Sequence, residues 1–272
     1  AMPPRPGASQ LVPAGHQAAN RLLVLDYDDT LCPSSWIAAA PERVVTQRDA
    51  EALGHIEEGI AALLERATAL DMRVVIITNA DEDWVRFSSA RFLPRVVPLL
   101  SQIKVVSARQ YEPLYPGRSV CWKAAAFTHV AKAFFQEAGR GAREVVSIGD
   151  SNDERLAVRA AAQPLDATPK AVKLVDAPSL HTLACQLRTV TTCLPFLAQA
   201  GHAIDVDVAA VLSYVGVAHA DGGPVHDALQ RVWQDAAWGL LTAIRFQSAQ
   251  AAAPPPDPPA DAPGSPAVAA LA

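Results

Sequence analysis

The sequence has few cysteines and no long apolar run, and each shortage excludes a class of protein. Only four of its 272 residues are cysteines, with no CxxC spacing, so we expect neither a disulfide scaffold nor a zinc site. Reduced thiols are typical of the cytoplasm, where we expect this protein. No apolar run approaches the ~20 residues needed to cross a bilayer, so the sequence predicts no membrane partner.

Basic residues are also scarce, since 23 lysines and arginines face 28 acids and leave a net charge of −5. The basic residues form no cluster, which argues against a general basic field for nucleic acid. Hydrophobic residues make up 50% of the chain. That is enough for a sizeable core in one main domain, with at most a small appendage.

What the chain does contain is a strand-like segment that ends in acids. The apolar run 22–25 leads directly into a loop that carries Asp26, Asp28 and Asp29. A short apolar run bounded by polar residues is typical of a buried parallel strand. In open parallel sheets, ligands bind at the carboxyl ends of the strands. The three acids therefore lie where a functional site is expected.

Helical and strand patterns alternate along the rest of the chain. Helices are expected over residues 48–70, about 81–97, from near Ser119 to Gly139, 152–162 and 180–194, and strands over 74–77, 103–106, 145–148 and 172–175. Ser119 or a neighbour is expected to cap its helix. The alternation predicts a doubly wound, Rossmann-like α/β sheet, mostly parallel and flanked by helices.

Changes in composition divide the chain into four segments. Residues 1–20 are expected to be a disordered leader, and residues 21–200 should form the α/β domain. A helical extension is expected over 201–248. Its amphipathic stretch 225–246 should pack on the core or, alternatively, contact a partner or a second copy. Residues 249–272 are rich in Ala and Pro, which predicts a disordered tail.

The spacing D-x-D-x-T-L at residues 26–31 resembles the first motif of the haloacid dehalogenase (HAD) superfamily of phosphohydrolases. Three further stretches resemble the remaining motifs in the same order: residues 74–79, Lys123 near a helix start, and residues 145–154. The resemblance covers roughly residues 21–176. It implies a HAD-like fold in which the four motifs converge on one site.

This resemblance implies a role for each matching residue. Asp26 would be the nucleophile that forms an aspartyl-phosphate, and Asp28 would be the general acid and base. Thr78 and the backbone at Asn79 would bind the phosphoryl oxygens. Lys123 would neutralise developing charge and orient Asp26.

The resemblance also implies Mg²⁺ as cofactor. The carboxylates of Asp26 and Asp150 and the backbone carbonyl of Asp28 would be its protein ligands. Charge balance favours the same ion, because four or more converging carboxylates and a phosphate ester exceed what one lysine can neutralise.

Two further positions would support the site from an outer shell. Thr30 would brace the loop after the first strand. In the family, the last acid usually lies four or five residues after the acid that corresponds to Asp150. Glu154 is at plus four and is favoured, while Asp153, at plus three, stays open as the alternative.

Two functions are open. An acid at Asp28 favours a Mg²⁺-dependent phosphomonoesterase over the ATPases and dehalogenases of the superfamily, which lack it. The intervals between the motifs leave no room for a large cap domain, so an open, capless site is expected. Such a site suits a phosphorylated macromolecule, or a small molecule if another surface closes over it. The alternative is a catalytically weak scaffold with a HAD fold that binds partners through its C-terminal helix and tail.

Overall fold

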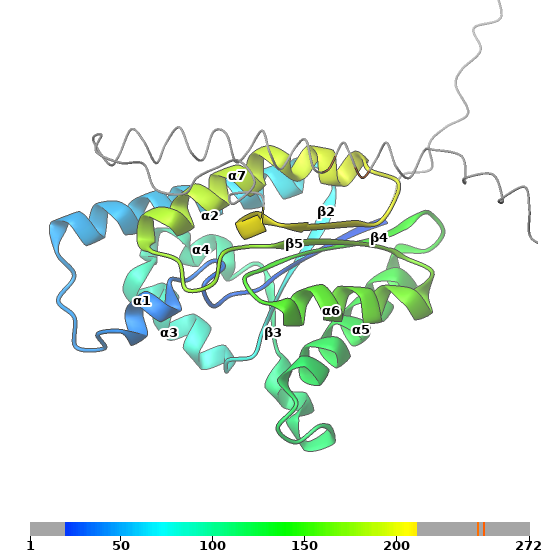
Figure 1. Ribbon diagram of the computed structural model, residues 1–272, viewed down its shortest axis with the longest axis horizontal. Helices are drawn as coiled ribbons and strands as arrows, with labels where there is room; N and C mark the ends of the chain where they lie inside the picture. The colour runs from blue at the N-terminus through cyan, green and yellow to red at the C-terminus, as the bar shows by residue number, and fades with distance from the viewer. Residues whose placement is uncertain (1–19, 211–243, 245–246, 248–272) are drawn as a thin grey trace, which may run out of the picture.

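The computed structural model describes residues 20–210 together with Ile244 and Gln247. Six strands form one all-parallel sheet in the order β3-β2-β1-β4-β5-β6. Their bounds are β1 Asn20–Leu25, β2 Met72–Thr78, β3 Lys104–Ser107, β4 Arg143–Gly149, β5 Thr168–Lys173 and β6 Ile204–Asp207. The expected Rossmann-like α/β fold is thereby confirmed (Figure 1).

The strand order changes direction at β1, and this change positions the candidate site. Strand β1 pairs with β2 on one side and with β4 on the other, so that Leu25 lies opposite both Ile76 and Ile148. In such sheets the loops that leave the two central strands diverge, and they leave a crevice at the carboxyl edge. The loops that carry Asp26 and Asp150 follow β1 and β4 and therefore lie side by side at this edge.

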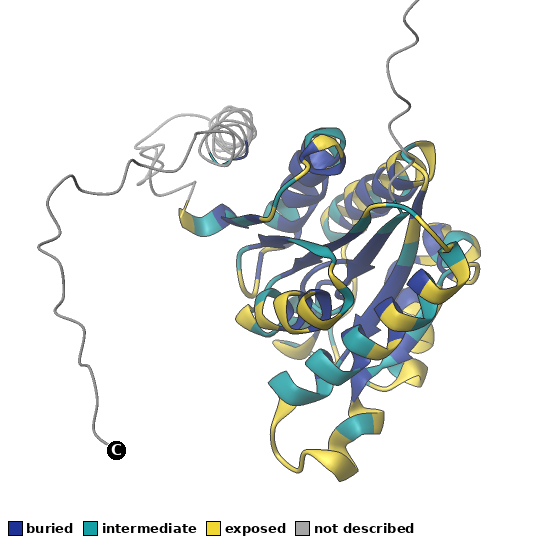
Figure 2. Cartoon of the chain, turned by 90° about the vertical axis from the view of Figure 1, so that its right-hand side faces the viewer, coloured by how far each residue is buried: buried dark blue, intermediate teal, exposed yellow. Residues whose placement is uncertain are grey.

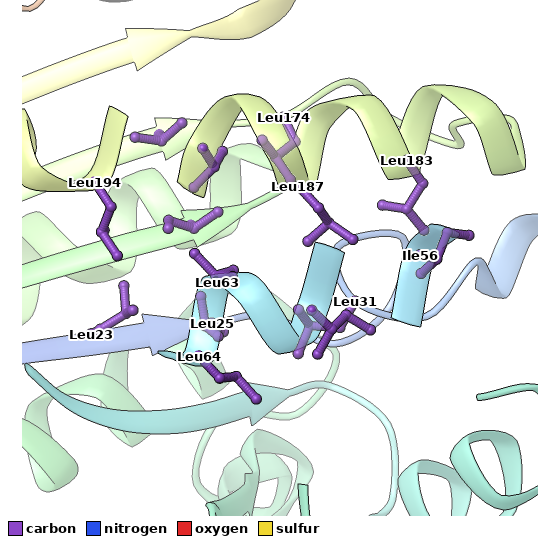
Figure 3. Close-up of a cluster of buried hydrophobic side chains, with 14 of the residues drawn as sticks. Leu23, Leu25, Leu31, Ile56, Leu63, Leu64, Leu174, Leu183, Leu187 and Leu194 are labelled. Carbon is purple, nitrogen blue, oxygen red and sulfur yellow. The ribbon is translucent and has the colours of Figure 1, made fainter. Parts of the chain in front are cut away.

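Helices cover both faces of the sheet (Figure 1). One face carries α2 (Gln47–Ala69) and α7 (Leu180–Gln199), which pack on the β1 side chains Leu23 and Leu25. Figure 3 shows this layer, with Leu63 of α2 and Leu187 of α7 between the strands and the helices. The opposite face carries α5 (Ser119–Ala138) and α6 (Asn152–Ala162).

The alternation of side chains along the strands explains the two layers. Leu22 and Val24 point to the layer of α5 and α6, whereas Leu23 and Leu25 point to the layer of α2 and α7. Both faces of the strands are therefore buried, and exposed residues lie on the outer faces of the helices (Figure 2). This is why the β1 sequence is an unbroken apolar run rather than an alternating one.

The prediction of one helix over about residues 81–97 is wrong in its extent. Helix α3 spans Glu82–Phe92 and ends before Pro94, because proline cannot donate the next helical hydrogen bond. A 3-10 turn η1 (Pro94–Val96) and the short helix α4 (Val97–Leu100) follow it. No helix or strand was expected between residue 106 and Ser119. Part of this region forms the 3-10 segment η2 (Ala108–Leu114).

The side-chain cap expected for α5 from Ser119 or a neighbour is not formed. The capping position is Arg118, where no side chain bonds to the helix end, and Ser119 is the first helical residue. The remaining short elements are α1 (Ser34–Ala38) after β1 and the 3-10 turn η3 (Gln163–Leu165) after α6. Within the described residues, no helix has the length and apolarity needed to cross a membrane.

Strand β6 was not expected from the sequence, and it carries the sheet past the domain boundary predicted at residue 200. It pairs with β5, and its Asp205 binds Arg155 of α6 through two hydrogen bonds of 2.8 and 2.9 Å. The side chain of Gln247 bonds to both the backbone N–H and the carbonyl of Asp205, and Ile244 is buried in the core. The other residues of the expected 225–246 helix, the leader up to residue 19 and the tail lie outside the described residues.

Candidate active site

Asp26 is the first residue after β1, at the carboxyl edge of the sheet. Its backbone N–H donates to the carbonyl of Ile148 at 2.9 Å, which extends the pairing with β4 by one residue. Its carboxylate is 4% exposed and accepts a hydrogen bond of 2.7 Å from Nζ of Lys123. Burial raises the pKa of Asp26 well above its ordinary value, the charge of Lys123 opposes this, and Glu154 adds to it.

Lys123 comes from the second turn of α5 and is buried between two carboxylates. Its Nζ donates to Asp26 and also to Oε1 of Glu154. Burial alone would lower the pKa of Lys123, but attraction by Asp26 and then by Glu154 outweighs it and raises the pKa. The lysine is therefore held as a cation inside the protein, which is the state needed to neutralise a phosphoryl group.

Glu154 joins the start of α6 to this lysine. Its Oε2 accepts hydrogen bonds from the backbone N–H and hydroxyl of Ser151, at 2.9 and 2.6 Å, which completes a capping box. Burial acts to raise the pKa of Glu154, but Lys123 outweighs it and the pKa is lowered. Of the two acids that the sequence left open, Glu154 contacts Lys123, whereas Asp153 accepts a 3.2 Å hydrogen bond from Ser119 near the surface.

Asp150 directly follows β4, beside the loop that carries Asp26. Burial, followed by repulsion from Glu154, raises the pKa of Asp150 to about 7 although Lys123 opposes the shift. The preceding residue, Gly149, lies against the Glu154 side chain, so that a Cβ at this position would be 2.7 Å from Cδ of Glu154. A side chain at this position would therefore displace Glu154 from its place beside the lysine.

Asp28 is held by donors from three different elements. Its Oδ1 accepts hydrogen bonds from the Ser34 hydroxyl of α1 at 2.5 Å and from the Trp84 indole N–H of α3 at 2.8 Å. Its Oδ2 accepts from the Thr78 hydroxyl at the end of β2, at 2.9 Å. The expected general acid is thus fixed at the carboxyl edge, next to the first strand and the second.

The structure brings Thr78 to the site, with its hydroxyl engaged by other protein groups. Its Oγ1 accepts the backbone N–H of Ala80 at 2.9 Å and gives its own proton to Asp28. Asn79 follows it, and its side-chain oxygen is buried without a hydrogen-bond partner among the described residues. Any ligand that accepts a hydrogen bond from Thr78 would therefore compete with Asp28.

The expected brace at Thr30 is not seen as a side-chain interaction. Its hydroxyl is buried and has no hydrogen-bond partner in the described part of the chain. The loop is instead closed by the carbonyl of Tyr27, which accepts the backbone N–H groups of Leu31 and Cys32 at 2.9 Å each. Asp29 adopts a left-handed conformation with φ of 51° and accepts from the N–H of Ser35 at 2.9 Å, which ties the loop to α1.

No group of three or more His, Cys, Asp or Glu side chains suited to a metal occurs in the described residues. The expected Mg²⁺ set is smaller, with two carboxylates and one carbonyl oxygen. Asp26 and Asp150 fit that set because they follow paired strands, repel each other and both have raised pKa values. Two buried carboxylates that repel each other are stabilised by a cation, and hard oxygen donors suit Mg²⁺.

Sequence reasoning missed Ser34 and Trp84. One signal was available for the tryptophan, which lies in the first turn of a helix that follows a motif strand. A partly buried indole N–H usually finds an acceptor, and the acids after β1 are within its reach. Ser34 gave no comparable signal, because a serine near a loop is common and its contact depends on how α1 folds back over β1.

Comparison with protein-family models, curated proteins and solved structures gave no match for this chain, so any assignment rests on its own residues.

Proposed function

We propose that this protein is a Mg²⁺-dependent phosphomonoesterase of the HAD type that works through an aspartyl-phosphate. The observation that carries the proposal is the pairing of buried Asp26 with buried Lys123 at the carboxyl edge, with Asp28 on the same loop as Asp26 and Asp150 on the adjoining loop. A buried lysine beside a strand-end carboxylate is suited to phosphoryl transfer, where catalysis consists mainly of positioning and charge stabilisation.

In the first step, a carboxylate oxygen of Asp26 attacks phosphorus. Lys123 engages Oδ1, which leaves Oδ2 as the attacking oxygen. A bond forms from Asp26 to phosphorus while the bond to the leaving oxygen breaks, and Asp28 gives that oxygen its proton. The buried ammonium group of Lys123 neutralises charge on the transferring group, and Glu154 keeps Lys123 in place.

In the second step, water hydrolyses the aspartyl-phosphate. Asp28, now ionised, takes a proton from the water as its oxygen bonds to phosphorus, and the bond between phosphorus and Asp26 breaks. The products are inorganic phosphate and the original carboxylate. Asp28 donates its proton in the first step and regains one in the second, so one acid at position 28 serves the whole cycle.

The carboxylates of Asp26 and Asp150 and the backbone carbonyl of Asp28 would hold Mg²⁺. When bound, this ion supplies positive charge for the phosphate oxygens and orients them. The chain's own contribution is to keep both carboxylates at the ends of paired strands, where they cannot separate.

We further propose an open, capless site. The interval between β1 and α2 holds only the five-residue helix α1 and a loop, and the interval between β2 and α5 holds α3, η1, α4, β3 and η2. An open edge accommodates a phosphorylated side chain on a macromolecule or a small phosphate ester.

The test is hydrolysis of 4-nitrophenyl phosphate with and without Mg²⁺, in the wild type and in Asp26→Asn. We expect Mg²⁺-dependent turnover that falls by at least about a thousandfold in the variant. Asp71→Asn, an exposed change before β2 at the opposite edge of the sheet, is the matched control and should retain activity. A folded wild type that is inactive on a broad panel of phosphate esters would overturn the proposal in favour of the scaffold function.

A further inference from the structure

Asp28 has more hydrogen-bond donors around it than the loop alone provides. Three side chains reach its carboxylate, from α1, β2 and α3, and they are separated from it by 6, 50 and 56 residues in the chain. The ring of Trp84 lies beside the ring of Phe87, with the two centroids 6.2 Å apart. The carboxylate is therefore held by elements that fold around it.

We propose that Trp84 and Ser34 are positioning residues that fix Asp28 by its Oδ1 and reserve Oδ2 for the proton that is transferred. This inference rests on the proposed phosphomonoesterase function and adds two residues to it. Neither residue contacts the reacting atoms, since both bind the oxygen of Asp28 that faces α1 and α3.

A carboxylate has a limited number of acceptor positions. Each oxygen has about two lone-pair directions. Oδ1 already accepts two hydrogen bonds, from Ser34 and Trp84, whereas Oδ2 accepts one, from Thr78. A proton on Asp28 therefore finds its open position on Oδ2. That oxygen also faces Thr78, which lies at the end of β2 next to the β1 loop.

Without the two donors, the carboxyl group can turn about its own bond and place the proton elsewhere. General acid catalysis depends on reaching the leaving oxygen in the transition state, so a displaced proton costs most when the leaving group is poor. A good leaving group departs with little help from an acid. The dependence of rate on the leaving group therefore reports the position of the Asp28 proton.

The experiment compares phenyl phosphate, which has a poor leaving group, with 4-nitrophenyl phosphate, which has a good one. In Trp84→Phe we expect kcat/KM for phenyl phosphate to fall about 10- to 100-fold, and kcat/KM for the nitrophenyl ester to fall less than about threefold. Hydrolysis of the aspartyl-phosphate still needs Asp28 as base, so this second step should become slower in the variant. For the nitrophenyl ester, kcat should then fall, and a burst of one nitrophenol per enzyme should precede the slow steady state.

Two controls separate positioning from general damage. Trp122→Phe removes another indole N–H, one that donates to the carbonyl of Tyr115 at 2.6 Å, and should leave the leaving-group dependence unchanged. Ser34→Ala should resemble Trp84→Phe, and Ser34→Thr, which keeps the hydroxyl, should restore the wild-type dependence.

The outcomes are distinct. An equal loss for both esters in Trp84→Phe, or an unchanged rate for both, would overturn the inference while the wild-type activity still supports the proposed function. A wild type without turnover of either ester would overturn the proposed function and this inference with it.

Discussion

Nζ of Lys123 lies 2.7 Å from Oδ1 of Asp26, although 97 residues separate them in the chain. The same amine contacts Glu154, so one cation joins β1, α5 and α6. All three groups are buried. A charge in such a place is costly unless it is paired, so each member of the trio depends on the others for stability as well as for chemistry.

Replacing the lysine tests this dependence. Lys123→Met leaves two buried carboxylates without their cation, and we expect the free energy of unfolding at pH 8 to fall by about 3–5 kcal/mol. The loss should shrink in acid, because protonated carboxyls no longer need a partner. Urea unfolding followed by circular dichroism measures it, with Lys132→Met on the exposed side of the same helix as control. Equal stability of Lys123→Met and the wild type at pH 8 would contradict the buried trio.

Gly149 offers a test that leaves every charged group in place. In Gly149→Ala the new methyl group overlaps Glu154, which Ser151 and Lys123 hold on either side. We expect a loss of about 1–3 kcal/mol in unfolding free energy, together with a large fall in phosphatase turnover. Gly201→Ala, where a methyl group meets open space, is the control. If Gly149→Ala were as stable and active as that control, the close packing of Glu154 would not be needed.

The sequence predicted those parts of the molecule that depend on local pattern. Strand β1 was evident because an apolar run buried on both faces has no alternation, and Asp26 was evident because it directly follows that run. The choice between Asp153 and Glu154 was not local, since both contact α5 and it depends on which one reaches Lys123. Strand β6 has four residues, two of them acidic, and its pairing depends on β5 and Arg155 rather than on its own sequence.

Lys170 provides a prediction on pH outside the candidate site. It is fully buried, lies 3.0 Å from Glu144, and donates to the carbonyl of Leu197 at 2.7 Å. Burial lowers its pKa, although Glu144 opposes the shift. Between this lowered pKa and the ordinary value of 10.5, the unfolded chain binds a proton that the folded chain has released. Stability should therefore rise with pH in this window, by at most about 1.4 kcal/mol per pH unit.

The measurement is urea unfolding at pH 8, 9 and 10 for the wild type and for Lys170→Met. The variant lacks the titrating amine, while Arg21 still pairs with Glu144 at 2.9 Å. The stability of the wild type relative to Lys170→Met should increase towards pH 10. Lys132→Met should follow the wild type, and a constant difference between wild type and Lys170→Met would show that Lys170 does not titrate in this range.

Mg²⁺ affinity should depend on pH because the proposed ligands bind protons too readily. The pKa of Asp150 is raised to about 7, and that of Asp26 is raised as well, both first of all by burial. Protons compete with the cation below these values, so affinity must rise as pH rises. With one proton displaced, the dissociation constant should increase about tenfold for each pH unit below 7.

Isothermal titration calorimetry with Mg²⁺ at pH 6, 7 and 8, each in two buffers of different ionisation enthalpy, measures both the affinity and the protons released. Proton release should approach one per Mg²⁺ at pH 6 and decline at pH 8. Asp150→Asn should lose most of the binding, and Asp71→Asn should behave as the wild type. Binding that is equally tight at all three pH values, with no proton released, would show that the ion displaces no proton from Asp26 or Asp150, and retained binding in Asp150→Asn would show that Asp150 does not hold the ion.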